Sequence, residues 1–299
     1  MKSNIQFNKF YKTFNFISLF LIIFSLIILV FKGLNYGVDF KGGTLIELRT
    51  NDKQITITKL RNSFLNMNLG DVSVKKFGNE TDYLIKFEKK RNDNNNFINE
   101  IKDELTLSIG KGFDFRRVEN VGPKVSAELL KSGIIAICIS LAAMLFYIWI
   151  RFEWQFSVGA IIALFHDVII TLGIFSVFSL EINLSIVAAV LTIVGYSMND
   201  TVVIYDRVRE NLKKLGDTKI FDITNISINE TLSRTIITSI TTLLALLSIY
   251  LFGGEILKGF SLAMILGVVF GTYSSIYIAN PILILFRVSR KTIVKEDEA

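Results

Sequence analysis

The sequence predicts a multi-pass α-helical membrane protein that carries a separate α+β domain outside the membrane. Hydrophobic residues make up 51% of the 299-residue chain, and they gather in long, almost uncharged stretches. A bilayer-spanning helix needs about 20 mostly apolar residues, and several of these stretches reach that length. One long polar block separates the first stretch from the rest, which predicts a folded domain between the first and second spans.

Six apolar stretches have spanning length. They cover residues 14–31, 133–150, 156–180, 184–205, 236–252 and 260–286. The first follows three lysines, as a signal peptide would, but its apolar run is longer than a usual signal-peptide core. No small-x-small cleavage site follows it, so we expect an uncleaved first span.

The positions of the positive charges predict the orientation. Residues 1–13 hold three lysines and no acid, and the segment 206–234 and the tail 287–299 are also rich in lysine and arginine. The short connections "SLEIN" and "GGEILKG" hold only one lysine between them. The positive-inside rule therefore places both termini and a loop at 206–234 in the cytoplasm. The block 32–131, which follows the first span, then lies on the other side of the membrane. It is also basic, but long loops are exempt from the rule, so its charge does not change this orientation.

The polar block has the pattern of a small sandwich. Alternating runs typical of strands are "GTLIELRT", "VSVKKF", "DYLIKFE" and "GFDFRRVENV", and runs with helical spacing are "TITKLRNSFLNMN" and "NNNFINEIKDELTL". In chain order they read βαββαβ, which predicts a ferredoxin-like fold. The following "GPKVSAELLKSG" is expected to be a helix that leads into the second span. The remaining five helices, with the loop 206–234, form a transmembrane domain over 132–286.

Asp200 is an acid about 16 residues into the fourth span, in "GYSMNDTVV". A carboxylate at bilayer depth costs roughly 2.5–3.5 kcal/mol on insertion scales, so such residues are functional candidates by default. The alternative is an acid that only caps or snorkels near the helix end. Beside it, a small or polar helix face could pack closely on another helix and hydrogen-bond across it. That face consists of Ala188, Thr192, Gly195 and Asn199.

Arg234 opens the fifth span in "NETLSRTIITSITTLL". Positive-inside bias alone predicts an arginine at this place. A polar stripe of Thr235, Thr238 and Thr242 continues inward from it, however, and suggests a hydrated path along which Arg234 could reach toward Asp200. Pairing with arginine would favour the ionised acid, and protonation would release the arginine.

Asp167 is the second intramembrane acid, and it follows the single histidine, His166, in "ALFHDV". A His–Asp pair at this depth could pass protons, because histidine titrates near neutral pH. The two side chains could equally satisfy each other or a partner helix. For Asp167, His166 and Asn199, the sequence leaves open whether the side chains form a secondary proton relay or serve packing.

The composition argues against several function classes. With one cysteine, Cys138, and one histidine, a disulfide, a zinc site and a haem site are not expected. The chain has no Walker loop, nucleophile elbow or HExxH motif. We therefore expect a protein that is not an enzyme, binds no nucleic acid and needs no cofactor. Any work it performs would draw on a gradient, which supplies about 2.3 kcal/mol per charge per 100 mV.

Five motifs resemble the SecD/SecF family of bacterial protein-export membrane proteins, and specifically its SecF members. They are "GVDFKGGTLIEL", "VGPKVSAELL", "RFEWQFSVGAIIALFHDV", "GYSMNDTVVIYDRVREN" and "TLSRTIITSITTLL". Their order and spacing match along nearly the whole chain. The resemblance implies the six-span half of the RND superfamily type, with a periplasmic domain, in the bacterial inner membrane.

The resemblance also implies partners and site residues. A SecD subunit would supply the other half of a pseudo-symmetric core, and the complex would act with the SecYEG channel on unfolded preproteins, using the proton motive force. Asp200 in "SMNDT" and Arg234 in "LSRT" match the proton-relay aspartate and arginine of the family.

Two other interpretations compete with this one. One is half of an RND-type proton-driven small-molecule exporter, which predicts larger outer domains than a block of about a hundred residues. The other is a non-conducting structural anchor at the channel, which would make Asp200 and Arg234 dispensable.

Overall fold

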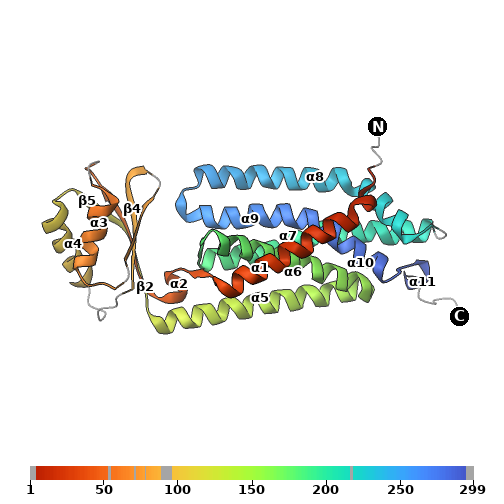
Figure 1. The fold of residues 1–299 in the computed structure, drawn as a ribbon, viewed down its shortest axis with the longest axis horizontal. Coiled ribbons are helices and arrows are strands. Elements are labelled where there is room, and N and C mark those ends of the chain that lie inside the picture. Colours follow the sequence, from red (N-terminus) through yellow and green to blue (C-terminus); the bar gives the residue numbers. More distant parts are fainter. Residues whose placement is uncertain are drawn as a thin grey trace. The chain divides into compact units, whose positions relative to one another are not determined.

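The structure is a computed structural model, and it describes residues 5–52, 55–70, 72–77, 79–88, 96–215 and 218–293 (Figure 1). The chain divides into two compact units. The helical unit comprises Met1–Asn35 and Ile135–Ala299, and the sheet unit comprises Tyr36–Ile134. Parts of the expected terminal segments, residues 1–4 and 294–299, lie outside the described residues.

The sheet unit has the expected βαββαβ order. Its elements are α2 (Val38–Lys41), β2 (Gly43–Thr50), α3 (Ile57–Asn66), β3 (Val72–Phe77), β4 (Asn79–Phe87), α4 (Asn96–Ile109) and β5 (Phe113–Val121), and β1 (Asn35–Tyr36) precedes them. The four longer strands lie in the order β3-β4-β2-β5, and each neighbouring pair is antiparallel. This order is that of a ferredoxin-like sheet, so the prediction is confirmed.

Buried apolar side chains that alternate along the strands form the core of this unit. Ile46 and Leu48 of β2 are at most 1% exposed, and they belong to one buried cluster with Ile85 of β4. Leu60 of α3 and Leu105 of α4 complete that cluster from the helices. The helical and strand periods therefore bury one common set of apolar residues, as amphipathic elements must.

The paired glycines between α2 and β2 have a steric reason. Gly42 and Gly43 have φ values of 79° and 127°, a region that L-residues rarely adopt. A Cβ on Gly43 would lie 2.6 Å from the carbonyl oxygen of Phe87 on β4. The two glycines thus allow the chain to turn into the sheet and approach β4 closely.

The helical unit contains the six predicted spans. Its elements are η1 (Phe7–Phe10), α1 (Tyr11–Phe31), α5 (Pro123–Arg151), α6 (Trp154–Val177), β6 (Glu181–Ile182), α7 (Leu184–Lys214), α8 (Ile220–Phe252), α9 (Glu255–Ser274), the π-helix η2 (Ser275–Ala279), α10 (Asn280–Leu285) and α11 (Arg290–Ile293). Six helices of the described chain are long and apolar enough to cross a membrane. The sixth candidate span consists of α9, η2 and α10 together, over Leu257–Leu285. The expected helix at "GPKVSAELLKSG" is the first part of α5, which belongs to the sheet unit up to Ile134 and to the helical unit beyond it.

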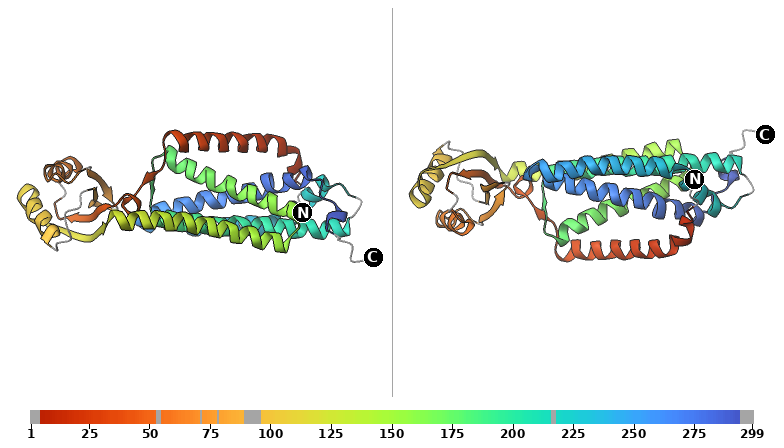
Figure 2. Two further views of the ribbon diagram at one scale, coloured as in Figure 1. Left: turned by 90° about the horizontal axis from the view of Figure 1, so that it is seen from below. Right: turned by 90° about the horizontal axis from the view of Figure 1, so that it is seen from above.

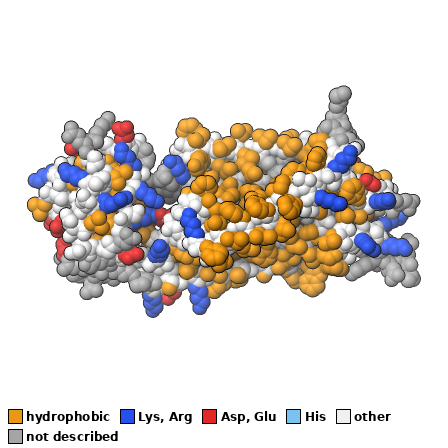
Figure 3. Space-filling model, viewed as in Figure 1, with side chains coloured by type: hydrophobic (Ala, Val, Ile, Leu, Met, Phe, Trp, Pro, Cys, Tyr) orange, Lys and Arg blue, Asp and Glu red, His pale blue; other side chains and the backbone are white. Residues whose placement is uncertain are grey.

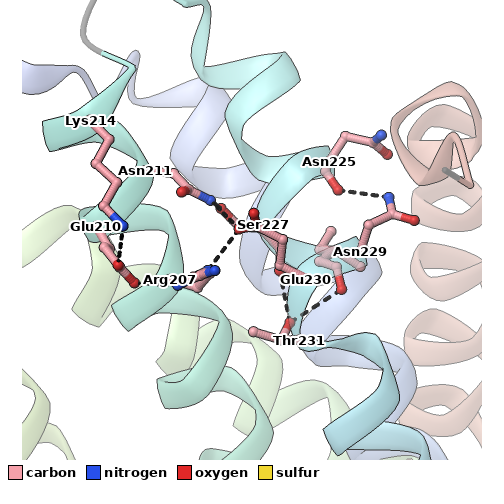
Figure 4. Close-up of polar contacts among 10 residues, drawn as sticks. Arg207, Glu210, Asn211, Lys214, Asn225, Ser227, Asn229, Glu230 and Thr231 are labelled. Atoms are coloured by element: carbon pink, nitrogen blue, oxygen red, sulfur yellow. Dashed lines mark hydrogen bonds and ion pairs between the residues drawn. The ribbon is translucent and has the colours of Figure 1, made fainter. Parts of the chain in front are cut away.

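The segment 206–234 is mostly helical, although we expected a loop there. α7 continues to Lys214 and α8 starts at Ile220, so only a few residues separate them. Asn211 on α7 donates to the Ser227 hydroxyl at 3.0 Å and to Glu230 at 2.8 Å on α8, and Arg207 donates to Glu230 at 2.7 Å (Figure 4). These cross-helix bonds stabilise a hairpin that hydropathy alone does not reveal.

The helices differ in how much of their surface the chain itself covers. α6, α7 and α9 form the interior of the helical unit, while α1, α5 and α8 keep most of their apolar side chains exposed. Figure 2 shows α1 along one side of the unit. α1 packs on α6, and a Cβ added to Gly173 of α6 would overlap Ser25 of α1. Figure 3 shows hydrophobic side chains over the middle of the helical unit and lysine and arginine side chains gathered near its end at α11. This distribution is typical of a helical protein whose middle part contacts lipid or other proteins.

Candidate functional site

Asp200 lies on α7, almost completely covered at 4% exposure. The Thr272 hydroxyl on α9 donates to its Oδ2 at 3.3 Å, and Thr272 in turn lies 2.8 Å from the Ser239 hydroxyl on α8. A chain of two hydroxyls therefore connects the carboxylate to both neighbouring helices. Both groups on this path are neutral hydroxyls, and no cation forms an ion pair with Asp200 within 4.0 Å among the described residues.

Two glycines of α9 explain why short side chains reach across to α7. A Cβ on Gly271 would lie 3.0 Å from the Cβ of Ser197, and one on Gly267 would overlap the side chain of Ile193. The close approach of the two backbones brings Thr272 within reach of Asp200. The small-xxx-small spacing in the last span thus produces the close packing that it predicts.

The small-residue face of α7 is open in this chain. We call Ala188, Thr192, Gly195 and Asn199 the α7 stripe, and all four residues are exposed. A Cβ on Gly195 would meet nothing within 4 Å. No described helix of the chain covers the stripe, so Asp200 lies at the border between the packed interior and an uncovered small and polar surface.

Arg234 lies on the exposed side of α8. Its charge attracts the Asp200 carboxylate, but no ion pair within 4.0 Å joins these two described residues. Tyr196 of α7 lies between the two helices, and its hydroxyl is 3.1 Å from the Thr242 hydroxyl and donates to the Thr238 carbonyl at 3.2 Å. The expected polar stripe of α8 therefore leads from Arg234 along the side of α7 that carries Tyr196 and Asp200.

Asp167 on α6 is fully buried, with 0% exposure, and is surrounded by donors. The His166 ring nitrogen Nδ1 lies 2.8 Å from its Oδ1. Oδ2 accepts from the Ser197 hydroxyl of α7 at 2.6 Å and from the Ser274 hydroxyl of α9 at 2.8 Å. We call these four residues the Asp167 cluster, and it joins the three interior helices at one point.

Tyr273 of α9 connects His166 to the first span. Its ring stacks on Tyr273 with centroids 5.8 Å apart, and the Tyr273 hydroxyl contacts the Ser18 hydroxyl at 2.7 Å and donates to the Phe14 carbonyl at 2.8 Å. The buried Nε2 atom of His166 has no hydrogen-bond partner among the described residues. Both carboxylate oxygens of Asp167 therefore have hydrogen-bond partners, whereas the Nε2 atom of His166 has none among the described residues.

The structure brings Asp167 and His166 into direct contact and leaves Asp200, Asn199 and Arg234 unbonded to one another. Sequence reasoning did not name Thr272, Ser274 or Ser197 as partners of the two acids. The signal was the polar run "TYSS" at 272–275, which follows the second packing glycine in the middle of a span. Among the described residues, no group of three or more histidine, cysteine or acidic side chains could hold a metal ion.

Comparison with known proteins agrees with this architecture. Residues 101–289 match the family described as "Protein export membrane protein SecD/SecF, C-terminal", and residues 27–53 match the "SecD/SecF GG Motif". The chain is 48% identical to the protein translocase subunit SecF of Rickettsia bellii (strain OSU 85-389), over 89% of both chains. It is 45% identical to that of Rickettsia prowazekii (strain Madrid E), over 95% of this chain and 92% of the relative.

Two solved structures are similar along most of the chain. A crystal structure of SecDF, a translocon-associated membrane protein from Thermus thermophilus, matches with a TM-score of 0.84 and 33% identity. A structure of SecDF in a super-membrane-facing form matches with a TM-score of 0.70 and 34% identity. Each match covers 94% of this chain and 38% of the SecDF chain, so this chain spans well under half of those proteins. The chain belongs to the SecD/SecF family of protein export membrane proteins.

Proposed function

We propose that the chain is a SecF-type accessory subunit of the Sec translocase, and that it couples the proton motive force to the completion of protein export. Membership of the family and the identity to SecF relatives support this assignment. The observation that carries the proton-coupling part is the position of Asp200, a buried carboxylate at the edge of an uncovered small and polar helix face.

The partner of this function is a SecD-like subunit, whose helices would cover the α7 stripe and Arg234. The match to SecDF chains that are longer than this one supports a two-part assembly. The SecYEG channel and an unfolded preprotein complete the set of partners. We place the protein in the bacterial inner membrane with both termini in the cytoplasm and the sheet unit in the periplasm, on the charge distribution of the sequence.

In the proposed mechanism, proton binding at Asp200 and at its counterpart on the partner changes the attraction to Arg234. When Asp200 is ionised, Arg234 is drawn toward it, and when Asp200 is neutral, Arg234 is released. The small-residue helix faces then shift against each other, and the sheet unit moves with them. The process makes and breaks no covalent bond, and it needs no cofactor beyond the gradient.

The test replaces the acid while keeping its shape. We expect Asp200→Asn, in cells that depend on the complex, to slow proton-dependent export of a periplasmic preprotein about 10-fold or more, while co-purification with the SecD-like subunit is unchanged. Asp200→Glu, which still titrates, should retain more export. Asp206→Asn is the matched control, because Asp206 is an exposed acid on the same helix that pairs with Arg151 at 2.8 Å.

Three results would count against the proposal. Export at the normal rate with Asp200→Asn would exclude proton binding at this residue. Normal export with both Asp200→Asn and Arg234→Gln would favour the structural-anchor function instead. Recovery of the chain only as a homo-oligomer would contradict the SecD-like partner.

A further inference from the structure

A cavity of about 390 Å³ lies at the end of the helical unit where α7 and α8 meet the segment before α11. Three cations line it: Lys219 just before α8, and Arg287 and Arg290 after α10. All three side chains are exposed. This cavity belongs to neither the Asp200 site nor the Asp167 cluster.

The floor of the cavity is apolar. Leu212 and Val288 line it, and each is only 2% exposed because both belong to the buried core of the helical unit. Phe221 also lines the cavity, and its ring is partly exposed. An apolar floor below a cationic rim matches an amphipathic ligand better than a free ion.

The cationic charge of the rim is uncompensated within the described chain. Among the residues that the structure describes, no acid lines the cavity. No described acid forms an ion pair within 4.0 Å with Lys219, Arg287 or Arg290. Asp222 lies in the first turn of α8 but does not line the cavity. Arg209 on α7 differs from these three cations, because it forms an ion pair with Glu153 at 3.2 Å.

The backbone at Arg287 is a second, independent observation. Arg287 has a φ of 51°, in the left-handed region. Its N–H donates to the Ile284 carbonyl at 3.0 Å, and the Val288 N–H donates to the Leu283 carbonyl at 3.0 Å. These two bonds form a Schellman motif, whose left-handed position is usually glycine. An arginine held there at a conformational cost points to a function for its side chain.

The surroundings of the cavity resemble a membrane interface. Leu285 and Phe286, directly before Arg287, are exposed, and the Phe286 ring lies 5.1 Å from the ring of Trp154, which is also exposed. Exposed aromatic rings beside cations are typical of the headgroup level of a bilayer. Acyl chains could therefore follow the apolar surface while a headgroup occupies the cavity.

We propose that this cavity binds the phosphate headgroup of an anionic phospholipid, with Lys219, Arg287 and Arg290 contacting the phosphate and Phe221 and Leu285 contacting the acyl chains. Free phosphate has the same headgroup chemistry, but it would make no use of the apolar floor. The site would hold one lipid at a fixed place on the basic end of the helical unit.

The test measures lipid retention by the purified full chain in a neutral detergent, using native mass spectrometry. The probes are phosphatidylglycerol, phosphatidylcholine and inorganic phosphate. We expect one phosphatidylglycerol to bind more tightly than either other probe. Each cation near a membrane surface contributes a factor of about five in affinity, so removing all three should weaken binding on the order of 100-fold. The variant is Lys219→Gln/Arg287→Gly/Arg290→Gln.

The matched control removes three exposed lysines that do not line the cavity, in the variant Lys9→Gln/Lys12→Gln/Lys213→Gln. It changes the net charge equally, and we expect it to weaken binding less than about fivefold. Arg287→Gly alone should weaken binding about fivefold without lowering the melting temperature, because glycine suits the left-handed backbone.

Several outcomes would overturn the proposal. Equal weakening by both triple variants would mean a diffuse surface attraction. Equal affinity for phosphatidylcholine would mean a merely apolar groove, and equal affinity for inorganic phosphate would mean an anion site that takes no lipid. The sequence also has three acids at 296–298. Lipid binding that occurred only after Glu296→Gln/Asp297→Asn/Glu298→Gln would show that the chain's own carboxylates compete for the cations.

Discussion

Ser197 of α7 donates a hydrogen bond to Asp167 of α6 over 2.6 Å, and Asp200 lies one turn farther along the same helix. The second helix at the site repeats this arrangement, because Ser274 of α9 bonds to Asp167 and Thr272, two residues earlier, bonds to Asp200. Both acids therefore accept a hydrogen bond from α9, and Asp167 also accepts one from α7, the helix that carries Asp200. A shift of α9 against α7 would change the hydrogen bonds of both acids together.

Replacing Asp167 distinguishes its packing function from a relay function. Asp167→Leu should lower the free energy of unfolding in detergent by about 1–3 kcal/mol for each buried donor left without an acceptor. The Ser197 hydroxyl would lose its acceptor and His166 would lose its bonded partner, whereas the Ser274 hydroxyl would keep the Gly271 carbonyl as an acceptor at 3.2 Å. Thermal unfolding of the purified chain measures the loss.

The matched variant removes the donors as well. Asp167→Leu/Ser197→Ala/Ser274→Ala should regain much of that stability, because replacing both partners by apolar groups is often nearly neutral. If this variant is stable and still supports proton-dependent export, Asp167 serves packing alone. If it is stable and export is lost, Asp167 belongs to the relay. A wild-type melting temperature for Asp167→Leu alone would contradict the hydrogen bonding of the Asp167 cluster.

Two glycines on facing helices should respond differently to alanine. Gly267→Ala should destabilise the chain by about 1–3 kcal/mol, because the added methyl would overlap the buried side chain of Ile193. Gly195→Ala meets nothing within 4 Å and replaces a mid-helix glycine, so it should leave the isolated chain as stable or stabilise it by up to about 1 kcal/mol. Thermal unfolding of both variants measures this contrast.

The same pair tests what covers the α7 stripe. If a helix of a SecD-like subunit packs closely on Gly195, Gly195→Ala should weaken co-purification of the two proteins although the isolated chain is stable. Gly267→Ala serves as the comparison for a defect inside the chain. Full recovery of the complex with Gly195→Ala would mean that no backbone approaches this residue closely.

The sequence predicts those features that depend on local pattern. The βαββαβ order follows from runs with period two and period 3.6, and the position of Asp200 beside a small-residue face follows from one helix alone. The partners of the two acids did not follow, because Thr272 and Ser274 are separated from them by 72 and 107 residues. A serine or threonine in a span bonds to its own helix as readily as to another, so its type does not identify its partner.

The helical hairpin of α7 and α8 was missed for a related reason. Hydropathy marks only the apolar, membrane-spanning part of each helix. The apolar signal stops where polar side chains begin, although the helix itself continues. Asn211 and Glu230 are polar, yet they stabilise the hairpin by bonding to each other across the two helices. A search for helical spacing of buried residues such as Val208, Leu212 and Ile223 would have extended both helices.

The sheet unit should lose a stabilising ion pair in acid. Arg49 on β2 donates to both oxygens of Asp82 on β4, at 2.5 and 2.6 Å, and these hydrogen bonds hold the pKa of the Asp82 carboxyl below its usual range. A carboxyl whose pKa is lowered by folding stabilises the fold at any pH above its unfolded pKa. That contribution disappears as the pH falls through the folded pKa. Asp82→Asn imitates the protonated state, so it should cost stability at neutral pH and nothing in strong acid.

Hydrogen exchange of β2 and β4 in the full chain measures this difference. At pH 7 we expect amides of these strands to exchange about two- to fivefold faster in Asp82→Asn than in the unmodified chain, the range for a partly exposed ion pair. The two proteins should converge as the pH is lowered below the usual range of aspartate, about 4. Asp114→Asn is the control, because Asp114 pairs with Arg49 in the strand register but accepts no hydrogen bond from the Arg49 side chain. A difference between wild type and Asp82→Asn that persisted unchanged into strong acid would mean that the amide perturbs the strands for a reason other than charge.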